Sequence, residues 1–137
     1  MPHTIDTLYA RRDELLTELC SLEEFRRGSI SVNYRKCGKS GCWCNEEGSQ
    51  GHGPQYLWTT KVNGKSVSKN LRLGPELEKC MQETERYKRF TELCESLLEV
   101  NEQLCDNRPV REIESDEELE SLKKKHQRQL LKKHRKR

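Results

Sequence analysis

The first hydrophobic residues of the chain recur at helical spacing. The stripe repeats about every seven residues, and Arg12 interrupts it once. It consists of Ile5, Leu8, Leu15, Leu19 and Leu22. Such a narrow stripe is typical of a helix that packs against another helix, as in a coiled coil. We therefore predict a helix over residues 4–27, capped by Thr4 and ended by Gly28.

Alternation replaces the helical spacing after Gly28. Residues 29–36 alternate apolar and polar side chains, which is typical of a half-buried strand. Two further alternating segments, 55–62 and 65–72, are separated by Asn63-Gly64. An Asn-Gly pair between strands favours a type I′ hairpin turn, which requires positive φ at both positions. The middle of the chain therefore predicts a small sheet of about three strands.

Helical spacing returns after Gly74-Pro75, where Pro75 suits the first turn of a helix. The apolar residues of this segment are three or four positions apart, and Pro109 follows them. They are Phe90, Leu93, Leu97, Val100 and Leu104. We expect a helix that runs from Pro75 to about Asp106 and pairs with the first helix. The predicted fold class is α+β, with two long, coiled-coil-like antiparallel helices that flank the small β-sheet.

The last part of the chain differs from the rest in composition. Residues 110–120 are acidic and are interpreted as a linker. Ser115 and Glu118 predict a capping box at the start of a third helix. We therefore predict two parts, a helix–zinc β-hairpin–helix domain over residues 1–109 and an acidic linker with a basic C-terminal helix or tail over residues 110–137.

Composition adds a strong segregation of charge. Only 31% of the 137 residues are hydrophobic and 36% are charged, which is little core material for a domain. The net charge is +3, yet residues 28–74 carry seven basic and two acidic residues, and residues 121–137 carry nine basic and no acidic ones. No apolar run approaches the ~20 residues that cross a bilayer, and the amphipathic N-terminus differs from a signal peptide. We therefore expect a cytoplasmic protein without a membrane partner.

Three of the seven cysteines and one histidine lie close together in a glycine-rich segment. Cys37, Cys42, Cys44 and His52 have the spacing C-x4-C-x-C-x7-H. Three thiolates and one imidazole are a ligand set that structural zinc prefers, and a closed set of four suits tetrahedral coordination. We expect Zn²⁺ as a structural cofactor borne by the small sheet. The alternatives are an iron–sulfur cluster, which more often uses four thiolates, and a set of unrelated thiols.

The other four cysteines lie at helix-stripe spacing, so we interpret them as small buried hydrophobic residues. They are Cys20, Cys80, Cys94 and Cys105. Catalysis is not expected either, because catalytic zinc keeps an open position whereas this set of ligands is closed. The chain contains no P-loop, G-x-S-x-G or dinucleotide motif. We predict that the protein is not an enzyme.

The central segment resembles an uncharacterised family of short bacterial and archaeal proteins. The matching motifs within residues 28–104 are CGK-x-GC-x-C, HGP and GK, followed by the YRRF-like element Tyr87–Phe90. The resemblance implies the zinc-bearing fold. It also favours work on nucleic acid, DNA rather than RNA, because such proteins are often encoded near mobile elements. The wide loop from Cys44 to His52 departs from the pattern, and the basic C-terminal extension lies outside it.

Basic residues near the zinc ligands, on the sheet and in the C-terminal part predict contacts with phosphates, because clustered cations release counterions on binding. The candidates are Arg35, Lys36, Lys39, Lys61, Lys65, Lys69, Arg72, Lys123, Lys124, Lys125, Arg128, Lys132 and Lys133. Trp43, between two ligands, is the candidate for an exposed contact with a base. Three other aromatic residues either stack on bases or, as we favour, cover the zinc site and form a small core. They are Tyr34, Tyr56 and Trp58.

These patterns predict a non-catalytic, zinc-stabilised nucleic-acid-binding protein, and the resemblance adds a role as a mobile-element accessory factor. Zinc would fix the hairpin so that four lysines form one preset phosphate-binding face. They are Lys39, Lys61, Lys65 and Lys69. The alternative is a coiled-coil interaction adaptor with a structural zinc site, whose helical stripes bind another protein or form a homodimer. For the basic tail, the alternatives are a solvated surface and an anionic membrane or acidic protein as partner.

Overall fold

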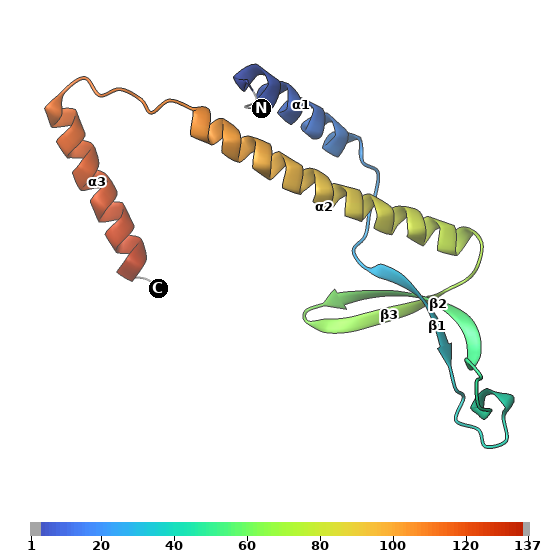
Figure 1. The fold of residues 1–137 in the computed structure, drawn as a ribbon. Helices are drawn as coiled ribbons and strands as arrows, with labels where there is room; N and C mark the ends of the chain where they lie inside the picture. Colours follow the sequence, from blue (N-terminus) through green and yellow to red (C-terminus); the bar gives the residue numbers. More distant parts are fainter. Residues whose placement is uncertain (1–3, 136–137) are drawn as a thin grey trace. The chain divides into compact units, whose positions relative to one another are not determined.

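The computed structural model describes residues 4–135 and contains three α-helices and one three-stranded antiparallel sheet (Figure 1). In chain order the elements are α1 (Ile5–Ser21), β1 (Ser29–Arg35), the 3-10 turn η1 (Trp43–Asn45), β2 (His52–Val62), β3 (Lys65–Leu71), α2 (Pro75–Asn107) and α3 (Asp116–Arg135). The predicted α+β class is confirmed. None of the helices in the described residues is long and apolar enough to cross a membrane.

The helix pair α1 and α2 contains the hydrophobic core. Five side chains of the predicted stripes form this core: Leu8, Leu15, Leu93, Val100 and Leu104. Leu19, Leu22 and Leu97 pack against it. The two helices run antiparallel, because residues at the end of α1 and just after it pair with progressively earlier residues of α2. The Arg89 Nη2 lies 2.7 Å from the Glu18 Oε1, and the Arg86 Nη2 lies 3.0 Å from the Oε2 of Glu23, which follows α1.

The first helix is shorter than the predicted residues 4–27. Thr4 caps it as predicted, with its Oγ1 accepting a hydrogen bond from the Thr7 backbone N–H at 3.3 Å. It ends at Ser21, and the chain continues in an extended form. Partners on α2 hold this extended segment: the Phe25 ring stacks on Phe90 at 4.7 Å, and the Arg26 backbone N–H donates to the Glu83 carbonyl at 3.2 Å. Contacts with α2 therefore hold residues 22–27 in an extended conformation, although their sequence pattern predicts a helix.

The cysteines outside the glycine-rich segment are less buried than predicted. Cys80 is buried and Cys94 is half-buried, whereas Cys20 and Cys105 are exposed. The prediction was wrong for the two exposed residues because each follows a stripe residue by one position. One position turns a side chain about 100° round the helix, which moves it from the helix interface to solvent.

The sheet has the strand order β1-β2-β3. Asn63 and Gly64 have φ of 52° and 79°, which confirms the predicted type I′ hairpin between β2 and β3. None of the strand residues is buried, so side chains on neither face form a closed core. The sheet therefore depends on attachments to other parts of the chain.

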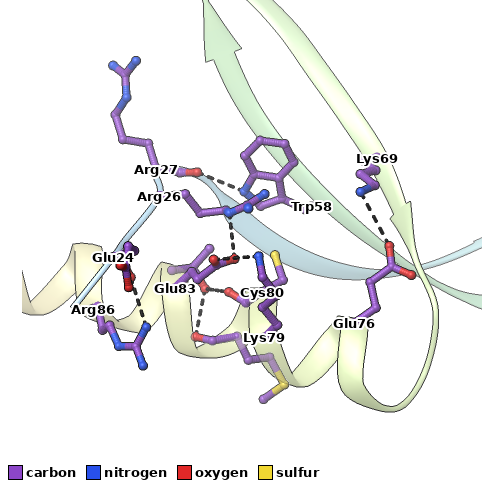
Figure 2. A network of polar contacts seen from close by, with 12 residues as sticks. Glu24, Arg26, Arg27, Trp58, Lys69, Glu76, Lys79, Cys80, Glu83 and Arg86 are labelled. Carbon is purple, nitrogen blue, oxygen red and sulfur yellow. Dashed lines mark hydrogen bonds and ion pairs between the residues drawn. The ribbon is translucent and has the colours of Figure 1, made fainter.

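One attachment joins the middle of β2 to the start of α2, as Figure 2 shows. The Trp58 Nε1 donates a hydrogen bond to the Arg27 carbonyl at 2.9 Å, and the Arg26 guanidinium lies over the Trp58 ring at 5.1 Å. Arg26 in turn forms an ion pair with Glu83 of α2, with 2.9 Å between Nε and Oε1. Lys79 forms a second ion pair with Glu83 at 2.8 Å. The indole thus connects the sheet to α2 through the segment that follows α1.

Contacts divide the chain into two units, residues 4–105 and residues 106–135. In the second unit, the Glu118 backbone N–H donates to the Ser115 Oγ at 3.2 Å, as a capping box requires. The Glu118 carboxylate accepts from the Glu114 backbone N–H instead of that of Ser115, and it pairs with Arg111 at 2.8 Å. None of the side chains described in α3 is buried.

Candidate metal centre

The connection between β1 and β2 carries the four residues predicted as metal ligands. Cys37 follows β1, Cys42 caps η1, Cys44 lies within η1, and His52 begins β2. Their three Sγ atoms and one imidazole nitrogen all lie within 4.8 Å of one another. The Cys37 and Cys44 Sγ atoms are 3.6 Å apart, and the Cys42 Sγ lies 3.3 Å from the His52 Nε2. The fold therefore brings together the set that the sequence spacing selected.

These distances suit one metal ion with four ligands. With metal–sulfur bonds of about 2.3 Å, the corners of a coordination tetrahedron are about 3.8 Å apart for two sulfurs and about 3.5 Å for sulfur and nitrogen. The two shortest ligand contacts are close to these values. Cys44 is fully buried, Cys42 and His52 are half-buried, and Cys37 is exposed. The four side chains are close enough together to bind a metal ion.

Hydrogen bonds within the loop hold the ligands in place. The Asn45 side-chain Nδ2 donates to the Lys39 carbonyl at 2.7 Å, which ties η1 to the loop segment directly after Cys37. The Asn45 backbone N–H donates to the Cys42 carbonyl at 3.1 Å and closes the turn between two ligands. This role of Asn45 was not predicted, because its only signal in the sequence is its position directly after Cys44. The loop is thus fixed by its own hydrogen bonds as well as by any metal.

Gly51 allows β2 to begin close to β1. Its φ is 95°, and a Cβ built at this position would lie 2.6 Å from the Arg35 carbonyl oxygen. Arg35 and His52 are paired in the β1–β2 register, so the close approach occurs directly beside a ligand. A side chain at position 51 would push His52 away from the cysteines. Glycine is therefore required here for space as well as for its backbone conformation.

The environment of the thiols favours at least one thiolate. The pKa of Cys37 is lowered to about 6, mainly by a hydrogen bond from the backbone of Lys39, with further help from the side chains of Cys42, Cys44 and His52. Cys44 accepts a hydrogen bond from the Cys37 backbone N–H at 3.4 Å, which lowers its pKa. Burial and the neighbouring thiols nevertheless raise the pKa of Cys44 overall. A bound cation would offset that effect, because metal ligation requires the thiolate form.

A protein-family model matches residues 5–82, which is more than half of the 137 residues. The chain belongs to the DUF6788 family. That family is described as a domain of unknown function, which agrees with the expected resemblance to an uncharacterised family. The DUF6788 match covers α1, the sheet, the metal cluster and the first turns of α2, whereas α3 lies outside it. No curated protein and no solved structure matches the chain significantly.

The aromatic residues of the DUF6788 domain lie in different environments. Trp43 is 55% exposed, and its ring packs edge-on against the His52 ring with centroids 4.8 Å apart. Tyr34 is 44% exposed, and its Cδ1 would lie 3.1 Å from a Cβ built at Gly53, next to the ligand His52. Trp58 serves the attachment to α2 described above, six residues along β2 from His52. None of Tyr34, Tyr56 and Trp58 is buried, so the predicted small aromatic core is wrong, and their covering of the metal site stays a prediction.

The lysines of the sheet do not share one face. In the β2–β3 register, Val62 pairs with Lys65 and Trp58 pairs with Lys69, so these two lysines lie on the Trp58 face. Lys61 precedes Val62 and therefore lies on the opposite face. Lys69 is also 3.7 Å from the Glu76 carboxylate of α2. The expected single face of four lysines is thus wrong.

The predicted cations beside the ligands and in α3 are solvent-exposed. Arg35, Lys36, Lys39 and Arg72 are exposed in the DUF6788 domain. In α3, Lys123 lies 3.3 Å from the Glu120 carboxylate. Among the described residues of the second unit, the other predicted cations of α3 form no ion pair with an acidic side chain: Lys124, Lys125, Arg128, Lys132 and Lys133. Their charge is therefore available to an anionic partner.

Proposed function

We propose that the protein is a non-catalytic, zinc-stabilised nucleic-acid-binding protein. The observation that carries this proposal is the charge of α3. Its last turn contains Lys132, Lys133, His134 and Arg135, while its acidic residues are confined to the N-terminal part. A helix with unpaired cations over most of its length repels itself and gains stability beside phosphates, where condensed counterions are released.

Zinc is the metal that suits the cluster best. Thiolate ligands select zinc, copper(I) or iron–sulfur clusters, and three thiolates with one imidazole are a common tetrahedral zinc set. The closed set leaves no coordination position for a substrate, so the ion would stabilise structure. It would join β1, η1 and the start of β2, which otherwise contribute no buried side chain except Cys44.

The metal end of the sheet offers a second contact for the same partner. Trp43 is held against a ligand ring yet keeps 55% of its surface exposed, and Arg35, Lys36 and Lys39 are exposed nearby in the sequence. An exposed indole beside cations suits stacking on an unpaired base. The helix pair suits a polyanion less well, because α2 and the segment to residue 108 carry nine acidic and five basic residues.

Fluorescence anisotropy of the zinc-loaded protein tests the proposal with labelled duplex DNA, single-stranded DNA and structured RNA over a range of salt concentrations. We expect binding that weakens with salt, since each phosphate contact contributes about 0.9 to the log–log slope on duplex DNA. Lys132→Gln/Lys133→Gln should reduce that slope by about two units. The matched double variant is Lys88→Gln/Arg108→Gln, which removes two exposed cations from other parts of the chain.

The two double variants remove the same amount of charge, so comparing them distinguishes binding through α3 from a general effect of the protein's net charge. An equal loss in both double variants would show that α3 makes no particular contribution. The absence of binding at low salt would overturn the proposal. A slope that changes in the α3 variant alone would support it, and the ranking of the three nucleic acids would identify the partner.

A further inference from the structure

The helix pair exposes an apolar stripe next to its buried core. On α1, Tyr9 follows buried Leu8, and Leu16 follows buried Leu15. On α2, Leu98 follows Leu97, which packs on the core. The side chains of Tyr9, Leu16 and Leu98 are 45%, 41% and 59% exposed. Cys20, Cys94, Asn101 and Cys105 occupy the equivalent positions after Leu19, Leu93, Val100 and Leu104. We call these seven residues the outer stripe.

The residues that precede the core positions by one are mostly polar, unlike those that follow them. A groove between the two helices is lined by Thr7, Ala10, Arg11 and Glu14 of α1 and by Ser96, Glu99 and Gln103 of α2, together with the core residues Leu8 and Val100. Five of the polar residues precede a core or core-packed residue by one position: Thr7, Glu14, Ser96, Glu99 and Gln103. One side of the helix pair is therefore polar, as expected of a surface that stays in water.

The outer stripes of α1 and α2 lie on the same side of the pair. In two antiparallel helices, residues displaced in the same sense from the facing stripes turn toward the same side. The groove confirms this geometry, because the preceding residues of both helices line it together. The following residues therefore meet on the opposite side, where they form one continuous face.

This face has almost no charge. None of its seven residues is an Asp, Glu, Lys or Arg, whereas the polar side contains Glu14 and Glu99. Arg12 reaches the face by lying over the Tyr9 ring at 4.8 Å, and Asp13 lies 3.4 Å from its guanidinium. Ile5, which is also 45% exposed, extends the face. The largest exposed apolar patch of a protein is often functional.

We propose that this face binds the same face of a second copy of the chain, giving a four-helix bundle. The inference is independent of the proposed nucleic-acid function. A foreign partner chosen by charge would need charged residues on the face, and the face has none beyond Arg12. A second copy offers the same uncharged helical surface, and in a two-fold symmetric dimer the same patch of each copy packs against that of the other. Two antiparallel helix pairs packed face to face form a four-helix bundle.

The size of the core supports a second copy as occupant. The helix pair buries five side chains in its cluster, which is few for an independently stable domain. Dimerisation would bury the outer stripe of all four helices and convert each stripe into core.

Sedimentation equilibrium of the zinc-loaded full chain tests the proposal from about 1 to 200 µM. The buffer should contain a reductant, because Cys20 and Cys105 are exposed thiols, and moderate salt. We expect a reversible dimer. Leu16→Glu and Leu98→Glu should each weaken dimerisation at least about tenfold, because each places a charge in the interface.

Met81→Glu is the matched control. Met81 is an apolar residue of α2 with 54% exposure, it lies more than four turns before Leu98, and it points about 100° away round the helix. Circular dichroism should show unchanged helix content in all three variants, since each replaced side chain is already exposed. A wild-type monomer throughout the range overturns the proposal, and so does a dimer that all three variants weaken equally or not at all.

Discussion

Glu83 links α2 to the segment that holds the sheet, so loss of its charge should destabilise the first unit. The Glu83 side chain is only 12% exposed, and its two carboxylate oxygens lie 2.9 Å from the Arg26 Nε and 2.8 Å from the Lys79 Nζ. Glu83→Gln keeps the size of the side chain and removes its charge. The Arg26 Nε, which is inaccessible to solvent, would then lose the carboxylate that faces it.

The expected loss follows from the exposure of the two partners. Lys79 is 65% exposed, so its ion pair contributes little beyond a few tenths of a kcal/mol. Arg26 is 36% exposed and lies over the Trp58 ring, and desolvation strengthens its contact with Glu83. Hydrogen bonds to charged groups contribute about 1.5–3 kcal/mol, and the contact between the Arg26 Nε and the Glu83 Oε1, an ion pair without hydrogen-bond geometry, contributes less. We expect Glu83→Gln to lower the free energy of unfolding by about 1–2 kcal/mol at pH 7.

The effect should depend on pH in a defined direction. The fold lowers the pKa of Glu83 below its ordinary value, first through the hydrogen bond from Lys79 and then through the positive charge of Arg26. A carboxyl whose pKa is depressed in the folded state stabilises the fold above its unfolded pKa, and it loses this contribution as the pH falls through the folded pKa. The difference between wild type and Glu83→Gln should therefore be complete at pH 7 and shrink below about pH 4.5.

Urea unfolding of both proteins between pH 7 and pH 3.5 measures this difference. Every other pH-dependent contribution is common to both proteins, so the comparison between them isolates Glu83. Glu85→Gln is the control, because Glu85 is exposed on the same helix. A difference that does not change with pH, or an equal loss in Glu85→Gln, would refute the role assigned to Glu83.

Two further predictions concern the metal cluster. Cys44→Ser should abolish stoichiometric zinc binding and disorder the β1–β2 loop, because serine is a poor zinc ligand. The control Cys105→Ser replaces an exposed cysteine outside the cluster and should still bind one zinc per chain. Metal analysis after dialysis measures the zinc content, and amide NMR spectra report the order of the loop. Gly51→Ala should weaken zinc binding about tenfold or more in a chelator competition, because the new Cβ would lie 2.6 Å from the Arg35 carbonyl oxygen. Gly48→Ala is the control, since Gly48 also has a positive φ, 83°, but has open space around it, and it should retain near wild-type zinc affinity. Equal affinities of the two glycine variants would contradict the spacing argument.

Features that depend on local spacing could be predicted from the sequence. The Asn63-Gly64 pair specified its hairpin because few other residues accept positive φ at both turn positions. The ligand set was recognisable because sulfur and imidazole at short spacing have few structural uses besides metal binding. Ser115 was recognisable as a cap for a similar reason, since its hydroxyl satisfies a free backbone N–H.

Features that depend on distant partners could not be predicted in the same way. The end of α1 at Ser21 is set by Phe90 and Glu83, which lie more than 55 residues further along the chain. The exposure of Cys20 follows from the exact rotation of α1 against α2, and apolar spacing defines that rotation only approximately. The faces on which Lys61 and Lys65 lie depend on the register of the hairpin. A shift of one residue would place a strand's side chains on the opposite face, and the sequence alone does not define the register to that precision.

The central strand is fastened at two points that have different chemistry. His52 at its first residue belongs to the metal cluster, and Trp58 is bound to the chain around Arg26 and Arg27. Six residues of extended chain separate them, about 20 Å. None of the side chains between these two points is buried, so the orientation of the strand depends on its two ends. A change in the tilt of β2 at Trp58 would therefore displace the ligand end, and Trp43 with it, by a larger distance.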